Sequence, residues 1–141
     1  MQRLNRIVWD NALSTGDPGI DDQHRVLINT FNELADAVEG GADKDNIGNI
    51  ISALKFYASW HFAREEECMG KYHCPVADKN KKAHAVFVQN FERYEKEFAA
   101  LDQVADLAFD MYTDLADWIY NHILAVDSKL YHCIHPTPGP T

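Results

Sequence analysis

Apolar residues recur at spacings of three and four along four long stretches of the chain, which is the period of amphipathic helices. The first stretch is expected to begin at Asp21 or Asp22 and to end at the Gly40-Gly41 pair. The second runs from about residue 43 to 71, the third from about 78 to 101 and the fourth from about 103 to 131. No stretch shows the alternating pattern of a strand.

The two ends of the chain lie outside this pattern. Gly16, Pro18 and Gly19 interrupt any helix before residue 20, so residues 1–19 are expected to form an arm that Trp9 packs onto the body. Residues 132–141 contain three prolines without apolar periodicity and are expected to be a disordered tail. Four amphipathic helices with short connections over residues 20–131 predict an all-α fold, an up-down-up-down antiparallel four-helix bundle with an N-terminal arm.

Composition narrows the class of protein. The chain has 141 residues and a net charge of −9, which argues against nucleic acid and anionic membrane surfaces as partners. No apolar run approaches the roughly 18 residues of a membrane span, and the N-terminus has no signal-peptide core. Three cysteines, Cys68, Cys74 and Cys133, form an odd set without C-x-x-C spacing. We therefore expect reduced thiols in a cytoplasmic protein. The protein is also expected to act as a monomer.

Polar residues interrupt the inward-facing positions of every predicted helix. One such histidine is usually hydrogen-bonded in a core, but four of them, accompanied by inward carboxylates, cannot all satisfy one another. A metal ion would satisfy them together, and imidazole with carboxylate suits iron, manganese or zinc. Antiparallel packing also places the four histidines at the same end of the bundle. The candidate ligands are His24, His61, Glu65, His84, His122 and Asp127, with Asn80 also on an inward position.

Asp127 does not fit this pattern simply. It follows His122 by five residues, which on an ideal helix places the two side chains about 140° apart. To meet the other ligands, the helix is expected to bulge locally, or the carboxylate to reach round from the flank of the helix.

These motifs, taken in order, resemble the bacterial single-domain members of the hemerythrin family over about residues 7–131. The matching segments are Gly19-Ile20-Asp21-Asp22-Gln23-His24, His61-x3-Glu65, Cys74-Pro75 leading to His84-x2-Phe87, and Trp118-x3-His122-x4-Asp127.

The resemblance implies a pair of iron ions, joined by an oxo or hydroxo bridge, with O2 as ligand. It implies His24 and His61 on one iron, His84 and His122 on the other, and Glu65 and Asp127 as bridges. Asn80 occupies the place of a seventh, histidine ligand, where we expect weak or water-mediated binding.

The implied function is reversible binding of O2, or of other small diatomic or anionic ligands, for storage, delivery or sensing. A di-iron enzyme remains the alternative, because an open position next to Asn80 suits peroxidase, NO-handling or iron-oxidising chemistry. A sensor whose oxidation state alters a partner-binding surface is disfavoured by the short arm. The chain contains neither Glu-x-x-His nor His-Glu-x-x-His, which excludes ferritin-like carboxylate enzymes and the corresponding zinc hydrolases.

Overall fold

Four long helices match the four periodic stretches of the sequence. In the computed structural model, which describes residues 3–134, they are α1 (Pro18–Glu39), α2 (Lys44–Lys71), α3 (Ala77–Ala100) and α4 (Ala105–Ala125). Short helices complete the described part: η1 (Asn11–Leu13), η2 (Asp127–Lys129) and α5 (Leu130–Ile134). Of the expected tail, residues 132–134 belong to α5 and residues 135–141 lie outside the described residues.

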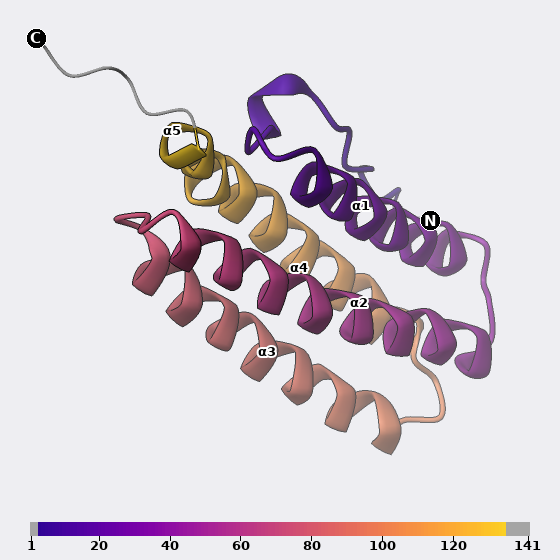
Figure 1. The fold of residues 1–141 in the computed structure, drawn as a ribbon. Helices are drawn as coiled ribbons and strands as arrows, with labels where there is room; N and C mark the ends of the chain where they lie inside the picture. Colours follow the sequence, from indigo (N-terminus) through magenta and orange to yellow (C-terminus); the bar gives the residue numbers. More distant parts are fainter. Residues whose placement is uncertain (1–2, 135–141) are drawn as a thin grey trace, which may run out of the picture.

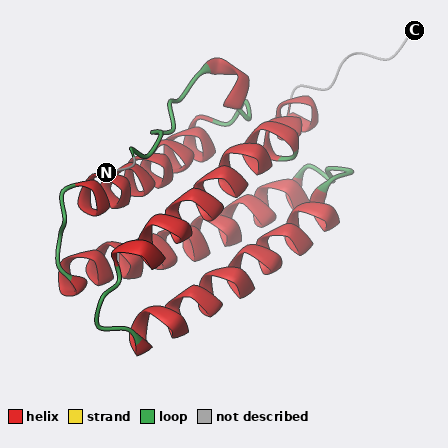
Figure 2. Ribbon diagram, turned by 180° about the vertical axis from the view of Figure 1, so that it is seen from behind, coloured by secondary structure: helices red, strands yellow, loops and turns green. Residues whose placement is uncertain are grey.

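The helices pack in chain order around one core. Contacts join α1 to α2, α2 to α3, α3 to α4, and α4 back to α1, so each helix has two neighbours (Figure 1). The described residues contain helices and loops without a strand (Figure 2). The predicted all-α, four-helix bundle is therefore confirmed. None of these helices is long and apolar enough to cross a membrane.

The start of α1 differs from the expectation. The sequence predicted a helix beginning at Asp21 or Asp22, but α1 already begins at Pro18. Proline is compatible with the first turn of a helix, because the N–H that it lacks would have no partner inside the helix. Asp17 caps this turn by accepting a hydrogen bond from the Ile20 N–H, at 3.0 Å. The prediction was wrong because it treated Pro18 as a helix breaker.

The arm runs along α1 (Figure 1), and polar contacts hold it at both ends. The Arg6 guanidinium bonds Asp36 at 2.7 Å and Glu39 at 2.8 Å, near the C-terminus of α1. At the other end, the buried Asp21 carboxylate accepts a hydrogen bond from the Thr15 N–H at 2.7 Å. Trp9 packs against the core as expected, and Leu4 and Leu13 of the arm are buried in it.

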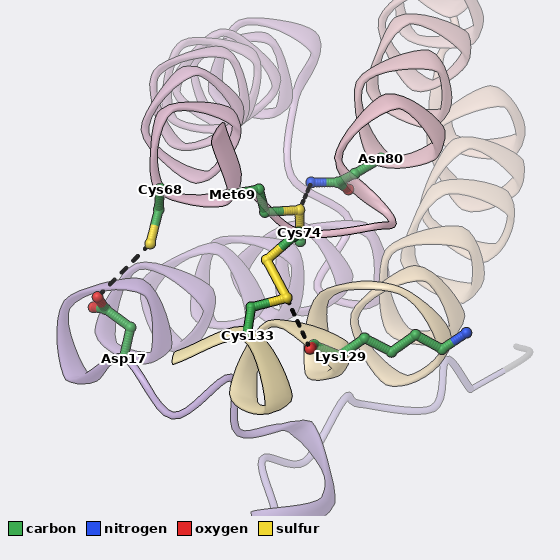
Figure 3. The surroundings of a disulfide bond; sticks show 7 residues. All are labelled: Asp17, Cys68, Met69, Cys74, Asn80, Lys129 and Cys133. Carbon is green, nitrogen blue, oxygen red and sulfur yellow. Dashed lines mark hydrogen bonds between the residues drawn. A yellow bond between two sulfur atoms is a disulfide. The ribbon is translucent and has the colours of Figure 1, made fainter. Parts of the chain in front are cut away.

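A small second core closes the end of the bundle where α2, α3 and α5 meet. It consists of Ile20, Met69, Cys74 and Leu130, with Cys133 packed against it. Cys74 and Cys133 form a disulfide here, with their Cα atoms 5.6 Å apart (Figure 3). The expectation of three reduced thiols was therefore wrong for these two, whereas Cys68 is free. The partners are separated by 59 residues, one in the loop between α2 and α3 and the other in α5.

Candidate metal centre

The polar residues on inward positions gather at the end of the bundle next to this small core. Potential ligand atoms within 4.8 Å of one another define two overlapping groups, whose members are all buried. We call them the α1/α2 half (His24 and His61 with both carboxylates) and the α3/α4 half (His84 and His122 with the same carboxylates). Glu65 and Asp127 belong to both, so the two halves share their acidic residues.

Each carboxylate turns one oxygen toward each half. Glu65 Oε2 lies 2.9 Å from His24 Nε2 and 3.3 Å from His61 Nε2, while Oε1 lies 3.2 Å from His84 Nε2. Asp127 Oδ2 lies 3.2 Å from His24 Nε2, and Oδ1 lies 3.2 Å from His122 Nε2. This is the arrangement that a pair of bridging carboxylates requires.

Asp127 reaches the centre because α4 ends before it. The sequence predicted one helix to residue 131 with a bulge or a reach from the flank, but α4 stops at Ala125. Val126 has φ −114° and ψ −58°, and Asp127 then begins the 3₁₀ helix η2. The change of direction brings the carboxylate, 1% exposed, onto the same side as His122. The expected continuous fourth helix was therefore wrong.

Asn80 lies in the α3/α4 half, completely buried. Its amide nitrogen donates to Glu65 Oε1 at 2.8 Å. It also donates to Met69 Sδ at 3.1 Å, as Figure 3 shows. Its oxygen accepts a hydrogen bond from His122 Nε2 at 2.6 Å. The side chain thus faces the centre, as its inward position on the third stretch indicated.

The two halves hold their imidazoles by different means. His61 Nδ1–H donates to the Gln23 amide oxygen at 2.8 Å, which leaves Nε2 as the nitrogen that faces the centre. In the α3/α4 half, the Phe62 ring stacks on His84 with centroids 3.8 Å apart, and the Trp118 ring stacks on His122 at 4.6 Å.

These supporting contacts were missed by sequence reasoning. Gln23 lies beside His24 in the chain and therefore off the inward-facing positions, so helical periodicity gave no sign of its contact. Phe62 and Trp118 are ordinary core aromatics by spacing. Only a contact across helices shows which imidazole each of these rings meets.

Burial and the shared carboxylates perturb the charges of the centre. Burial alone would lower the pKa of His24, but hydrogen bonds to Asp127 and Glu65 outweigh it and raise this pKa to about 10. Burial lowers the pKa of His61. Burial would raise the pKa of Glu65, yet the surrounding histidines hold it well below its ordinary value. Without a metal, a proton on His24 therefore partly neutralises the carboxylates.

The remaining unpaired atoms indicate that a cation fits here. His61 Nε2, His84 Nε2 and Asp127 Oδ1 are buried without a hydrogen bond, although each lies near a possible partner. Such orphaned atoms are costly in a core. Ligands about 2.1 Å from a common metal ion lie about 3 Å apart, close to the separations seen here. The donor set of imidazoles and carboxylates therefore fits a metal ion in each half.

Comparison with known proteins agrees with this geometry. The family model described as the hemerythrin HHE cation binding domain matches residues 15–134, which include every candidate ligand. The chain belongs to the hemerythrin family. It is 32% identical to a bacteriohemerythrin of Stenotrophomonas maltophilia (strain R551-3) over 121 residues, 86% of this chain and 76% of that protein.

Hemerythrins with lower sequence identity also match most of this chain. Hemerythrin subunit 1 of Golfingia vulgaris is 27% identical over 122 residues, covering 86% of this chain and 88% of that protein. A crystal structure of wild-type hemerythrin superposes with a TM-score of 0.79 at 28% identity, covering 91% of this chain and 97% of that one. Both the sequence resemblance and the bundle architecture are thus confirmed.

Proposed function

We propose that this chain is a non-haem di-iron protein that binds O2 reversibly. The observation that carries the proposal is the division of Glu65 and Asp127 between the halves, one oxygen to each side. Two buried four-residue groups with shared carboxylates suit a pair of metal ions held close together. Iron is the metal that membership of the hemerythrin family implies.

The assignment of ligands follows the halves. His24 and His61 would hold one iron, His84 and His122 the other, and Glu65 and Asp127 would bridge them. When bound, the pair of irons supplies the electrons that O2 binding requires. The α1/α2 half offers fewer protein donors, because the α3/α4 half also contains Asn80. We therefore place the small ligand in the α1/α2 half.

The chain's own residues keep this centre dry and oriented. Leu27, Phe31 and Ile119 are completely buried within two helical turns of His24 or His122. Their side chains exclude the water and protons that would convert a reversibly bound ligand into a released reduced product. The Gln23 hydrogen bond fixes the ring of His61, so that its Nε2 faces the centre before any metal binds.

A visible absorption spectrum tests this function directly. Iron-loaded, reduced protein should contain about two irons per chain and should be nearly colourless without oxygen. Admitting air should produce an absorption band that disappears again when oxygen is removed under argon. A band that forms once and cannot be reversed would contradict reversible binding.

A second candidate is a di-iron enzyme, and Asn80 is the observation that favours it. An amide in place of an imidazole leaves the α3/α4 half with fewer strong ligands, so that it can exchange a small molecule as well. Turnover with peroxide or NO as substrate, faster than in Asn80→His, would support the enzyme. No difference between the two proteins would leave O2 binding as the better proposal.

A further inference from the structure

The orientation of the Asn80 amide is fixed by its neighbours. Its nitrogen donates to Met69 Sδ (Figure 3) and to Glu65 Oε1, both of which accept hydrogen bonds. The reverse orientation would turn the amide oxygen toward these same acceptors, which is repulsive. The oxygen therefore faces the Nε2 atom of His122, 2.6 Å away, inside the α3/α4 half.

This contact cannot persist once His122 binds a metal. The oxygen accepts the proton on His122 Nε2, and the same nitrogen must give up that proton to become a ligand. Asn80 is 0% exposed, so its oxygen would then be a buried acceptor without a donor. Direct binding to the metal on His122 removes that cost, because the oxygen already lies at the spacing of neighbouring ligands.

We propose that the Asn80 oxygen is a direct ligand of the metal in the α3/α4 half, and that this half thereby accepts Mn(II) beside an iron in the α1/α2 half. The inference rests on the proposed two-metal site and goes beyond it by naming the seventh ligand and the second metal. The centre is then able to hold two different metals.

The chemistry of the donors supports manganese. With Asn80, the α3/α4 half presents two imidazole nitrogens and three oxygens, from Glu65, Asp127 and the amide. Imidazole favours iron over manganese, whereas carboxylate and carbonyl oxygens suit Mn(II). If an amide oxygen takes the place of a third imidazole, the α3/α4 half therefore loses more affinity for Fe(II) than for Mn(II). Its preference for Fe(II) over Mn(II) becomes smaller, while that of the α1/α2 half is unchanged.

The experiment offers metal-free protein equimolar Fe(II) and Mn(II) without oxygen, and then removes unbound metal. Elemental analysis counts both metals, and electron paramagnetic resonance reports the Mn(II) that is bound. Wild type should keep clearly more manganese per chain than Asn80→His, which should keep about two irons. Asn80→Leu has a similar volume without the oxygen and should bind Mn(II) at least tenfold more weakly in a titration with Mn(II) alone.

Two further variants make the outcome decisive. Asn90→His adds a histidine to α3 outside the ligand groups and should keep the metals of the wild type. Asn80→Asp keeps an oxygen at the same position and should bind Mn(II) at least as tightly as wild type, even if the leucine variant folds poorly. Equal Mn(II) affinity in Asn80→Leu, or lost affinity in a folded Asn80→Asp, would overturn the inference. Wild type that binds neither metal would overturn the proposed function as well.

Discussion

The α1/α2 half and the α3/α4 half present two imidazoles each to the same two carboxylates, but they are built differently around them. In the first half, the Gln23 amide hydrogen-bonds the far nitrogen of His61. In the second, Phe62 and Trp118 stack on the imidazoles, and Asn80 adds an amide beside His122. A hydrogen bond sets which nitrogen faces the metal, whereas stacking sets only the plane of the ring.

The two halves also differ in that a disulfide bond lies next to only one of them. The disulfide joins Cys74, just before α3, to Cys133 in α5, beyond Asp127. It therefore links the segments that flank the ligands of the α3/α4 half, while no disulfide of the described residues joins α1 to α2. A specific hydrogen bond thus orients an imidazole in the α1/α2 half, whereas ring stacking and a disulfide support the α3/α4 half.

Removing the carboxylate that the halves share should weaken metal binding in both of them. In Glu65→Gln, one carboxylate oxygen becomes an amide NH2 group that cannot bind a metal and the other loses its charge, so the carboxylate bridge between the two metal positions is lost. We expect loss of at least one iron per chain. The linked loss of stability should reach about 4 kcal/mol where free metal is a thousandfold above its Kd. Elemental analysis and thermal unfolding measure the two effects.

The exposed Glu67 supplies the control, since Glu67→Gln changes the same helix away from the centre. It should keep both irons and the midpoint of the wild type. A Glu65→Gln protein with full iron would show that the two halves do not depend on a common bridge.

Opening the disulfide should affect the α3/α4 half selectively. The bridge spans 59 residues, and the chain-entropy estimate for a loop of this length is about 4 kcal/mol of stability. Cys133→Ser should therefore lower the free energy of unfolding by about 2–4 kcal/mol in urea. It should also release the metal of the α3/α4 half first. Cys68→Ser, which removes the free thiol, is the matched control, and equal stability of the two variants would contradict the prediction.

Removing the hydrogen bond to His61 should weaken the α1/α2 half in the same selective way. Gln23→Leu keeps the volume of the side chain but loses the oxygen that accepts from Nδ1. We expect a roughly 10–100-fold loss of metal affinity, the usual effect of deleting such a partner. Metal titration of Gln23→Leu against Gln89→Leu, an exposed glutamine on α3, measures it. Loss from the α3/α4 half instead would reverse our assignment.

Helical periodicity was sufficient to predict which helical residues line most of the centre. It shows which side chains share one face of a helix, whatever those side chains contact. His24, His61, Glu65, His84 and His122 each lie on an inward position, and the structure brings them together. Their role as ligands remains a prediction. The same reasoning failed at Asp127, since period alone cannot show that α4 ends at Ala125 and that a 3₁₀ turn follows.

The features that escaped prediction depend on contacts between distant segments. Gln23 lies off the inward face, and its reach to His61 depends on how α1 packs against α2. The cysteine partners meet through the path of α5, which follows from the break in α4. The disulfide also removes the argument from reduced thiols for a cytoplasmic location. Local sequence thus determined the helices, and tertiary packing determined the supports of the centre.

The smallest expected effect is a pH dependence of the stability of the metal-free protein, which originates at His24 in the α1/α2 half. Hydrogen bonds to Asp127 and Glu65, opposed by burial, raise the pKa of His24 to about 10, above its unfolded value of 6.5. A raised folded pKa contributes stability that is fully present below pH 6.5 and is lost as the pH rises toward 10. The metal-free chain should therefore lose up to about 1 kcal/mol per pH unit between pH 7 and 9.

Thermal unfolding of the metal-free chain at pH 7, 8 and 9 measures this slope. His24→Gln cannot carry the proton, so its unfolding midpoint should vary less over the same range. In the iron-loaded protein the metal takes the place of the proton, and the fall in stability should disappear. A metal-free wild type that is equally stable at all three pH values would show that His24 is neutral between the two carboxylates.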